Sequence, residues 1–220
     1  MKPVTQTELL SILTKLGGDG SARKLIAIAG PPGAGKSTIA DELTRAFNSQ
    51  GHKYRAASVP MDGFHYDNGV LQAMGRLDKK GAPDTFDVHG FASLLQRLRN
   101  GNEGEDERED EIAIPLFDRK LEISRNAARI ITVDEKLLIV EGNYLLLNQG
   151  AWANLHRHFD ITIMLDVPME ELERRLVERW LSTGLSADEA RAKALENDIP
   201  NAKLVIENAH AADYVVRTVG

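Results

Sequence analysis

The sequence predicts an α/β fold in which a mainly parallel, five-stranded sheet is covered by helices on both faces. Two observations support this prediction. Short apolar runs alternate along the chain with longer segments in which apolar residues recur every three or four positions, the pattern of strands that alternate with helices. The short runs are apolar at consecutive positions, as expected for strands buried on both faces. We therefore expect three layers, with the sheet between two layers of helices.

Five runs of strand length are expected to form the sheet. They lie at residues 25–29, 54–60, 137–140, 161–165 and 214–216. A polar or turn-forming residue follows each run within two positions, so the runs are too short to be helices.

Segments with helical periodicity are expected beside these strands. A helix at 37–50 would direct its apolar residues inward, and apolar spacing indicates further helices around 91–98 and 172–180. Ser186 and Glu189 have the spacing of a capping box, which marks the start of another helix. An amphipathic helix is expected within residues 1–20.

Composition limits the possible functions. The 220 residues are 42% hydrophobic and 27% charged, which is ordinary for one soluble domain, and no repeat or linker divides residues 1–220. The absence of cysteine excludes disulfides, a thiolate nucleophile and cysteine-ligated zinc. No apolar run approaches the roughly 20 residues of a membrane span, and the start does not resemble a signal peptide. A cytoplasmic protein with no membrane contact is predicted.

The net charge of −6 argues against a nucleic-acid partner. Residues 101–111 hold seven acidic residues and one arginine, so the remainder of the chain carries no net charge. We expect this segment to be a solvated acidic loop between a helix and a strand.

The segment GPPGAGKST after the first strand matches G-x-x-x-x-G-K-[ST], the P-loop. Its glycines leave room for main-chain N–H groups to surround a phosphate, and the helix that follows adds unpaired N–H groups and a favourable dipole. Lysine supplies charge to the outer phosphates, and the serine hydroxyl can bind Mg²⁺. The predicted fold is therefore a P-loop NTPase fold. The expected ATP-binding residues are Gly30, Pro31, Pro32, Gly33, Ala34, Gly35, Lys36, Ser37 and Thr38.

Two acidic residues stand at the carboxyl ends of other strands, where such folds bind ligands. Asp62 follows the second strand, and could act as a base, touch Mg²⁺, or merely cap a turn. Glu141 follows four apolar residues, and a buried carboxylate is costly unless it is paired or metal-bound. A helix cap or salt bridge is the alternative for Glu141. A Ras-type switch is not indicated, because the chain lacks N-K-x-D.

These residues carry a resemblance to a known family. In order, PPGAGKST, MDGFHYDN, KGAPDTFDVHGF, PLFDR and VEGNYLLL resemble the uridine kinase, phosphoribulokinase and pantothenate kinase group of P-loop small-molecule kinases. The resemblance spans roughly residues 24–217. VEGNYLLLNQGAWANL and ENDIPNAKLV look most similar to bacterial proteins described as fructose transport system kinases or nucleoside/nucleotide kinases.

The resemblance implies roles for particular residues. Asp62 would be the catalytic base, and Ser37, Glu141 and Asp62 would lie at the metal. The acceptor pocket would contain His65, Tyr66, Asp84, Phe117, Arg119, Asn143 and Tyr144. A structural role for His65, a solvated Arg119, and helix capping by Asp84 or by Asp87 remain alternatives.

The resemblance also implies a helical lid at about residues 170–200. The lid keeps Arg174, Arg175 and Arg179, but Thr183, Gly184 and Leu185 replace the further arginines typical of uridine kinases. Arg175 and Arg179 would join Lys36 as catalytic residues that stabilise the transferred phosphoryl group. Ordinary helix pairing of these arginines with Glu171 and Glu178 is the alternative.

The sequence as a whole predicts an ATP-dependent kinase with Mg²⁺ that phosphorylates a hydroxyl of a small molecule. A sugar such as fructose is favoured as acceptor, and a nucleoside or pantothenate is the alternative. A regulatory ATPase without an acceptor is the competing class. ATP rather than GTP is implied by the resemblance alone, and the number of subunits is open, with a homodimer among the options.

Overall fold

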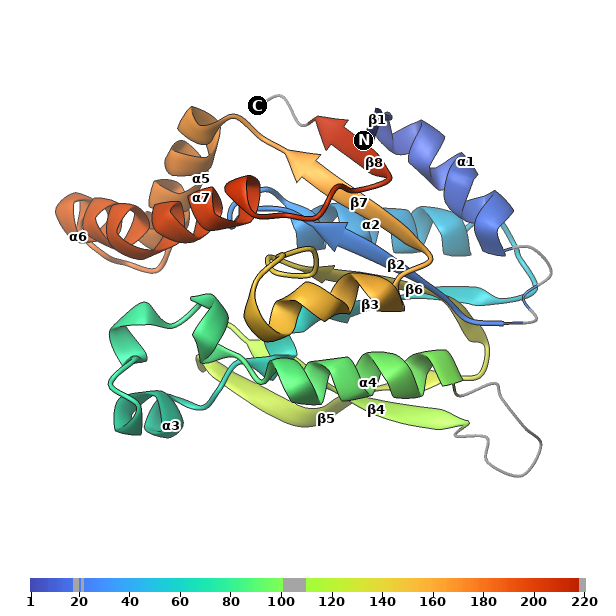
Figure 1. Cartoon of the computed structure of the whole chain (residues 1–220), viewed down its shortest axis with the longest axis horizontal. Helices are drawn as coiled ribbons and strands as arrows, with labels where there is room; N and C mark the ends of the chain where they lie inside the picture. Colours follow the sequence, from blue (N-terminus) through green and yellow to red (C-terminus); the bar gives the residue numbers. More distant parts are fainter. Residues whose placement is uncertain (18–19, 21, 101–109, 218–220) are drawn as a thin grey trace.

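The computed structural model describes residues 1–17, 20, 22–100 and 110–217 (Figure 1). Six parallel strands form the main sheet in the order β1-β8-β7-β2-β6-β3. Their bounds are Lys2–Pro3 (β1), Tyr214–Arg217 (β8), Ile161–Asp166 (β7), Lys24–Ala29 (β2), Glu135–Gly142 (β6) and Arg55–Pro60 (β3). The predicted parallel sheet with helices on both faces is confirmed. All five expected strands are present, and the two-residue β1 adds a sixth that the sequence did not indicate.

The central strand β2 divides the core into two clusters. Successive side chains of a strand point to opposite faces, so Ile26 and Ile28 pack in one cluster and Leu25, Ala27 and Ala29 in the other. The first face is covered mainly by α1 (Gln6–Gly17), α2 (Lys36–Asn48) and α5 (Met169–Ser182). The second is covered by α4 (Val88–Asn100) and the 3-10 segment η4 (Gly150–His158).

The segment that follows β7 forms an arm, here called the lid arm (residues 169–207). It consists of α5, α6 (Ala187–Lys193), a π-helical turn η5 (Ala194–Asp198) and α7 (Ile199–Glu207). The expected capping box is present, because the Ser186 side chain and the Glu189 side chain each bind the other's backbone N–H.

The connection from β3 to α4 (residues 61–87) forms a second arm. It contains η1 (Met61–Phe64), α3 (Asn68–Ala73), η2 (Leu77–Lys79) and η3 (Pro83–Thr85). Figure 1 shows the lid arm and this connection at the same end of the molecule, beyond the strands. None of the helices in the described ranges combines the length and apolar content that a membrane crossing requires.

An antiparallel hairpin, which the sequence did not indicate, packs beside η1. It pairs β4 (Glu111–Asp118) with β5 (Ile123–Thr132). Gly63 permits the close approach, because a Cβ there would collide with the carbonyl of Pro115, and the Ser124 hydroxyl donates a hydrogen bond to the Gly63 carbonyl. Of the expected acidic loop at 101–111, residues 101–109 lie outside the described residues, and Glu111 begins β4.

Candidate active site

The phosphate loop joins β2 to α2. Gly33 and Gly35 have φ values of +81° and +86°, a backbone conformation that residues with a Cβ rarely adopt. Gly35 precedes α2 and provides no side-chain cap, which leaves main-chain N–H groups at the helix start available for an anion. The buried Lys36 ammonium donates to the Pro31 carbonyl at 2.9 Å. The loop therefore has the backbone shape and the charge that a triphosphate requires.

Glu141 lies beside this loop because β6 pairs with β2. Its Oε1 accepts a hydrogen bond from Ser37 Oγ at 3.0 Å, and its side chain is buried. Burial, reinforced by the charge of Asp62, raises the pKa of Glu141 to about 7. Burial also lowers the pKa of Lys36 to about 8, although the charge of Glu141 opposes that change. Both charges are poorly solvated in the absence of ligands.

The oxygen atoms of Ser37 and Glu141 suit Mg²⁺. This hard cation prefers oxygen ligands and usually binds through one or two protein groups, substrate phosphates and water. The described part of the chain contains no cluster of three or more His, Cys, Asp or Glu side chains able to hold a metal. A hydroxyl and a carboxylate at the start of a phosphate-binding helix fit a cation shared with a nucleotide better than an all-protein metal cage.

Asp62 lies in η1, directly after β3, the strand next to β6. The structure pairs Pro60 of β3 with Glu141 of β6, so the two acidic residues stand at neighbouring strand ends. Asp62 Oδ2 accepts a hydrogen bond from Arg119 Nη2 at 2.7 Å. The Arg119 side chain is 64% exposed and that of Asp62 is 22% exposed. This ion pair was not foreseen from the sequence.

His65 packs between two aromatic rings on the same wall. Its ring centroid lies 4.0 Å from that of Phe86 and 4.7 Å from that of Phe117, and its Nδ1–H donates to the Asp62 carbonyl at 2.8 Å. Burial lowers the pKa of His65. Tyr66 and His65 both line a cavity of about 300 Å³, whose lining also includes residues of the hairpin. These contacts fit a structural role for His65, and its contact with an acceptor stays a prediction.

Two of the remaining predicted acceptor residues, Tyr144 and Asp84, already form hydrogen bonds within the protein. Tyr144 is buried and its hydroxyl donates to the Gly81 carbonyl at 2.6 Å, while burial raises its pKa. Asp84 is held by Arg76 through two hydrogen bonds, of 2.7 and 2.9 Å, which lower the pKa of Asp84. Asn143 is half-buried. The Asp87 side chain accepts from the Gly90 N–H at 2.9 Å, as expected for a helix cap.

The lid arginines face different partners. Arg174 is exposed and pairs with Glu171 and Glu178 on the surface of α5. Arg175 also binds Glu171, at 2.6 Å, and its Nη1 lies 3.5 Å from the Gly33 carbonyl in the phosphate loop. The predicted alternative of local helix pairing is therefore seen for Arg174 and in part for Arg175.

Arg179 is held differently, by an acidic residue outside its own helix. Arg179 Nη2 binds both carboxylate oxygens of Asp198 at 3.0 Å, and the Trp180 indole N–H binds the same carboxylate at 2.6 Å. Asp198 is buried in η5, and the charge of Arg179 also helps to lower the pKa of Lys36, after burial. The guanidinium of Arg179 is therefore anchored to η5 within the lid arm.

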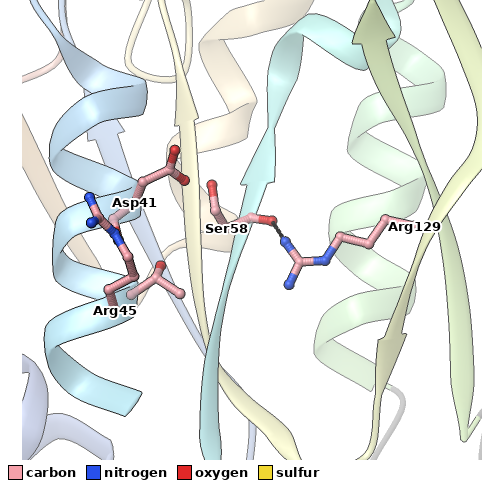
Figure 2. A pocket seen from close by; sticks show the side chains of 5 residues that line it. Asp41, Arg45, Ser58 and Arg129 are labelled. Atoms are coloured by element: carbon pink, nitrogen blue, oxygen red, sulfur yellow. Dashed lines mark hydrogen bonds between the residues drawn. The ribbon is translucent and has the colours of Figure 1, made fainter. Parts of the chain in front are cut away.

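A separate cavity of about 370 Å³ lies along the flank of β3 (Figure 2). It is lined by Asp41, Thr44 and Arg45 of α2, Ser58 of β3 and Arg129 of β5. Arg129 Nη1 donates to the Ser58 carbonyl at 2.9 Å across its rim. None of the predicted site residues lines this cavity.

Comparison with known proteins identifies the family. The family described as "AAA domain" matches residues 26–196. A solved structure of a "putative fructose transport system kinase" from Silicibacter sp. TM1040 is 39% identical, with a TM-score of 0.87 over 96% of this chain and 98% of that chain. The "putative uridine kinase C227.14" of Schizosaccharomyces pombe is 34% identical over 89% of this chain and 83% of its own length. The chain belongs to the uridine kinase-like family of P-loop kinases. YggC of Escherichia coli K12 is also 34% identical, over 88% of this chain and 77% of its own length.

As a P-loop kinase, the protein is an ATP-dependent phosphotransferase with an alcohol group as acceptor. Its acceptor is a small molecule. The geometry adds contacts that sequence reasoning did not foresee at this kinase site. Asp198 binds Arg179, the half-buried Asn197 side chain donates to the Lys80 carbonyl at 2.9 Å, and Lys80 Nζ lies 4.9 Å from the centroid of the Phe117 ring. ENDIPNAKLV carried a signal for the first two, and Lys80 begins the segment KGAPDTFDVHGF, but the family resemblance of that segment did not assign Lys80 a role.

Proposed function

We propose that this P-loop kinase transfers the γ-phosphoryl group of ATP to a hydroxyl of a sugar or a closely related polyol, with fructose as the first candidate. One observation carries the catalytic part of the proposal. The phosphate loop, Glu141 and Asp62 end three adjacent strands, β2, β6 and β3. Similarity to a protein described as a "putative fructose transport system kinase" supports a sugar.

The phosphate loop and Lys36 would hold the triphosphate. Ser37 and Glu141 are the residues that would hold Mg²⁺, and Asp62 stands within reach of the same site. When bound, Mg²⁺ supplies positive charge to the β- and γ-phosphate oxygens. Binding of these charges would also offset the cost of burying Lys36 and Glu141 beside each other.

Asp62 would orient the acceptor hydroxyl and take its proton. As the hydroxyl oxygen bonds to the γ-phosphorus, the bond from that phosphorus to the β,γ-bridging oxygen breaks, and ADP leaves with the electron pair. Arg175 and Arg179 would add positive charge as the phosphoryl group moves. Both arginines belong to α5 of the lid arm, so closure of this arm would complete the site and exclude water.

Two alternatives remain to be tested. A nucleoside acceptor would find the aromatic ring of Phe117 beside His65, and pantothenate is the other small-molecule candidate. A regulatory ATPase would hydrolyse ATP without any acceptor, and it would show no rise in turnover when small hydroxyl compounds are added.

The test is ADP release with a panel of fructose, other hexoses, uridine, cytidine, ribulose 5-phosphate and pantothenate. One acceptor is expected to raise the rate well above the basal rate and to yield a phosphorylated product.

Asp62→Asn should slow transfer at least about a hundredfold while ATP still binds. The control is Asp78→Asn, an exposed change whose wild-type side chain lies 3.9 Å from Lys79. Normal transfer by Asp62→Asn would remove Asp62 from the role of base.

A further inference from the structure

Asp198 is a buried carboxylate in the lid arm. It ends the π-helical turn η5, and its side chain is 10% exposed. Arg179 Nη2 donates to both of its oxygens at 3.0 Å, and the Trp180 indole N–H donates to Oδ2 at 2.6 Å. Burying a carboxylate is costly unless it is paired and hydrogen-bonded, and these three hydrogen bonds meet that requirement.

The π-helical turn sets the direction in which Asp198 faces. Its hydrogen bonds span five residues instead of four, so the side chains that follow point in directions that a continuous α-helix would not give them. Asn197, in the same turn, donates to the Lys80 carbonyl on the wall of the predicted acceptor site. One turn of a rare type, which occurs frequently at functional sites, therefore contacts both that wall and α5.

Arg179 lies one turn beyond the residues of α5 that reach the phosphate loop. Arg175 Nη1 lies 3.5 Å from the Gly33 carbonyl, and a Cβ on Gly33 would lie 3.1 Å from Leu176 Cγ. Residues three and four apart share a helix face, and helical side chains lean toward the N-terminus of their helix. Arg179 therefore leans toward the turn of α5 that contacts the loop. After burial, its charge also helps to lower the pKa of Lys36.

Arg179 is held on one side and open on the other. Both of its hydrogen bonds to Asp198 come from Nη2, so Nε and Nη1 have no hydrogen-bond partner among the described residues. Its side chain is 41% exposed, and its guanidinium carbon lies 5.2 Å from the centroid of the Trp180 ring. A guanidinium fixed in this way can bind phosphate oxygens with its open N–H groups and loses little side-chain freedom in doing so.

A purely structural role for Asp198 is the alternative. The Arg179–Asp198 pair joins α5 to η5, and a link between two segments of the lid arm would need no contact with substrate. The two roles differ in one measurable respect. A structural link contributes whatever residue 179 does in the reaction, whereas a residue that orients Arg179 has no effect on turnover once Arg179 is gone.

We propose that Asp198 is a positioning residue, which orients Arg179 for contact with the phosphoryl group during transfer. Asp198 acts through Arg179 and touches neither substrate. The inference rests on the proposed function in that it takes Arg179 as a ligand of the transferred group. It does not depend on which acceptor is used.

The test is a double-mutant cycle on kcat, measured by ADP release. Arg179→Gln should lower kcat about a hundredfold. Asp198→Asn keeps the shape of the side chain but removes its charge, and it should lower kcat about tenfold or more while KM for ATP changes less than about threefold. In the double variant, kcat should lie within about twofold of that of Arg179→Gln alone, because no guanidinium is left to orient.

Glu173→Gln is the matched control, because Glu173 also pairs across the lid arm, with Arg191 at 3.5 Å. It should leave kcat unchanged. Two independent, multiplying effects in the double variant would overturn the proposal, as would a normal kcat of Asp198→Asn. Faster turnover or tighter ATP binding by Asp198→Asn would also overturn it, since Asp198 would then restrain Arg179. If Asp198→Asn does not fold, Asp198→Glu takes its place in the cycle with the same expected dependence on Arg179.

The cycle is run with the acceptor that the panel identifies and, separately, with water as acceptor. If no compound of the panel raises ADP release, the proposed acceptor class fails. The cycle measured with water still decides the role of Asp198, so the two failures are distinguishable.

Discussion

Glu141 and Lys36 show how a single pair of side chains can favour function over stability. Both are buried, and burial shifts the pKa of each toward its neutral form. Between pH 4.5 and about 7, the Glu141 carboxyl is protonated in the folded chain but has lost its proton in the unfolded chain. The contribution of Glu141 to stability is therefore highest at low pH and is lost as the pH rises through this window.

Glu141→Gln should stabilise the ligand-free protein at pH 7.5. Glutamine has nearly the same shape but carries no charge, and Lys36 keeps its hydrogen bond to Pro31. Because the raised pKa of Glu141 means that its ionisation at pH 7.5 opposes folding, we expect Tm to rise by about 2–8 °C, corresponding to roughly 1–2 kcal/mol. At pH 4.5 the wild-type carboxyl is largely protonated in the folded state, so the difference should nearly vanish.

Differential scanning calorimetry at both pH values checks this expectation. A Tm difference that is the same at pH 4.5 and 7.5 would show that ionisation of Glu141 is not the cause. Addition of Mg²⁺ and a non-hydrolysable ATP analogue supplies a second readout. It should raise Tm of the wild type more than that of the variant, because the variant lacks the carboxylate proposed to hold the cation.

At this scale, local patterns predicted some contacts and missed others. Lys36, Ser37 and Glu141 could be placed from the sequence, because a loop motif and an acid at the end of an apolar run each fix their own position at the strand ends. The pairs Arg119–Asp62 and Arg179–Asp198 could not, since their partners lie 57 and 19 residues apart. Such contacts depend on how the hairpin and the lid arm pack, which no short pattern encodes.

At the scale of elements, the phosphate loop packs directly against the lid helix. A Cβ on Gly33 would lie 3.1 Å from Leu176 Cγ and 3.6 Å from the Leu172 carbonyl, both in α5. Gly33 therefore has two reasons to be glycine, its positive φ and its contact with α5. A side chain at this position would therefore press on α5.

Gly33→Ala should weaken ATP binding at least about tenfold and destabilise the fold. The methyl group adds backbone strain of roughly 1–3 kcal/mol and displaces α5 from the loop. Gly51→Ala is the matched control, because Gly51 has φ +71° but a Cβ there would meet no atom within 4 Å. It should cost roughly 1 kcal/mol and leave ATP affinity unchanged.

Titration with a fluorescent ATP analogue and urea unfolding measure the two effects. If both alanine variants lost stability equally and bound ATP like the wild type, the contact of Gly33 with the lid helix would not contribute to ATP binding.

The elements that sequence reasoning missed share a physical reason. The central strands β2 and β6 were found because burial on both faces makes residues 25–29 and 137–140 apolar at consecutive positions. In β5, Ile131 is buried whereas Arg125, Asn126 and Ala127 are exposed, so neither a continuous nor an alternating apolar pattern identifies the strand. Its partner β4 contains Pro115, which argues against a central strand. β1 is two residues long and takes its place only by pairing with β8.

At the scale of the whole molecule, one short loop connects the two arms. The carbonyls of Lys80 and Gly81 are adjacent in the chain but accept hydrogen bonds from distant elements. Asn197 of the lid arm donates to Lys80 at 2.9 Å, and Tyr144, just after β6, donates to Gly81 at 2.6 Å. The wall of the predicted acceptor site is therefore tied both to the lid arm and to the strand that ends in Glu141.

Asn197→Ala and Tyr144→Phe should each loosen this loop, and their effects should not add. Either change frees one of two neighbouring carbonyls, so the loop relaxes and the second bond contributes less. We expect the double variant to be less destabilised than the sum of the single variants by about 0.5–1 kcal/mol, as measured by urea unfolding.

Hydrogen exchange at residues 80–86 should rise in both single variants. Gln149→Ala, which removes an exposed long-range hydrogen bond to Asn208, should leave that exchange unchanged. Strict additivity, or unchanged exchange at 80–86, would mean that the lid arm and the acceptor wall are held independently.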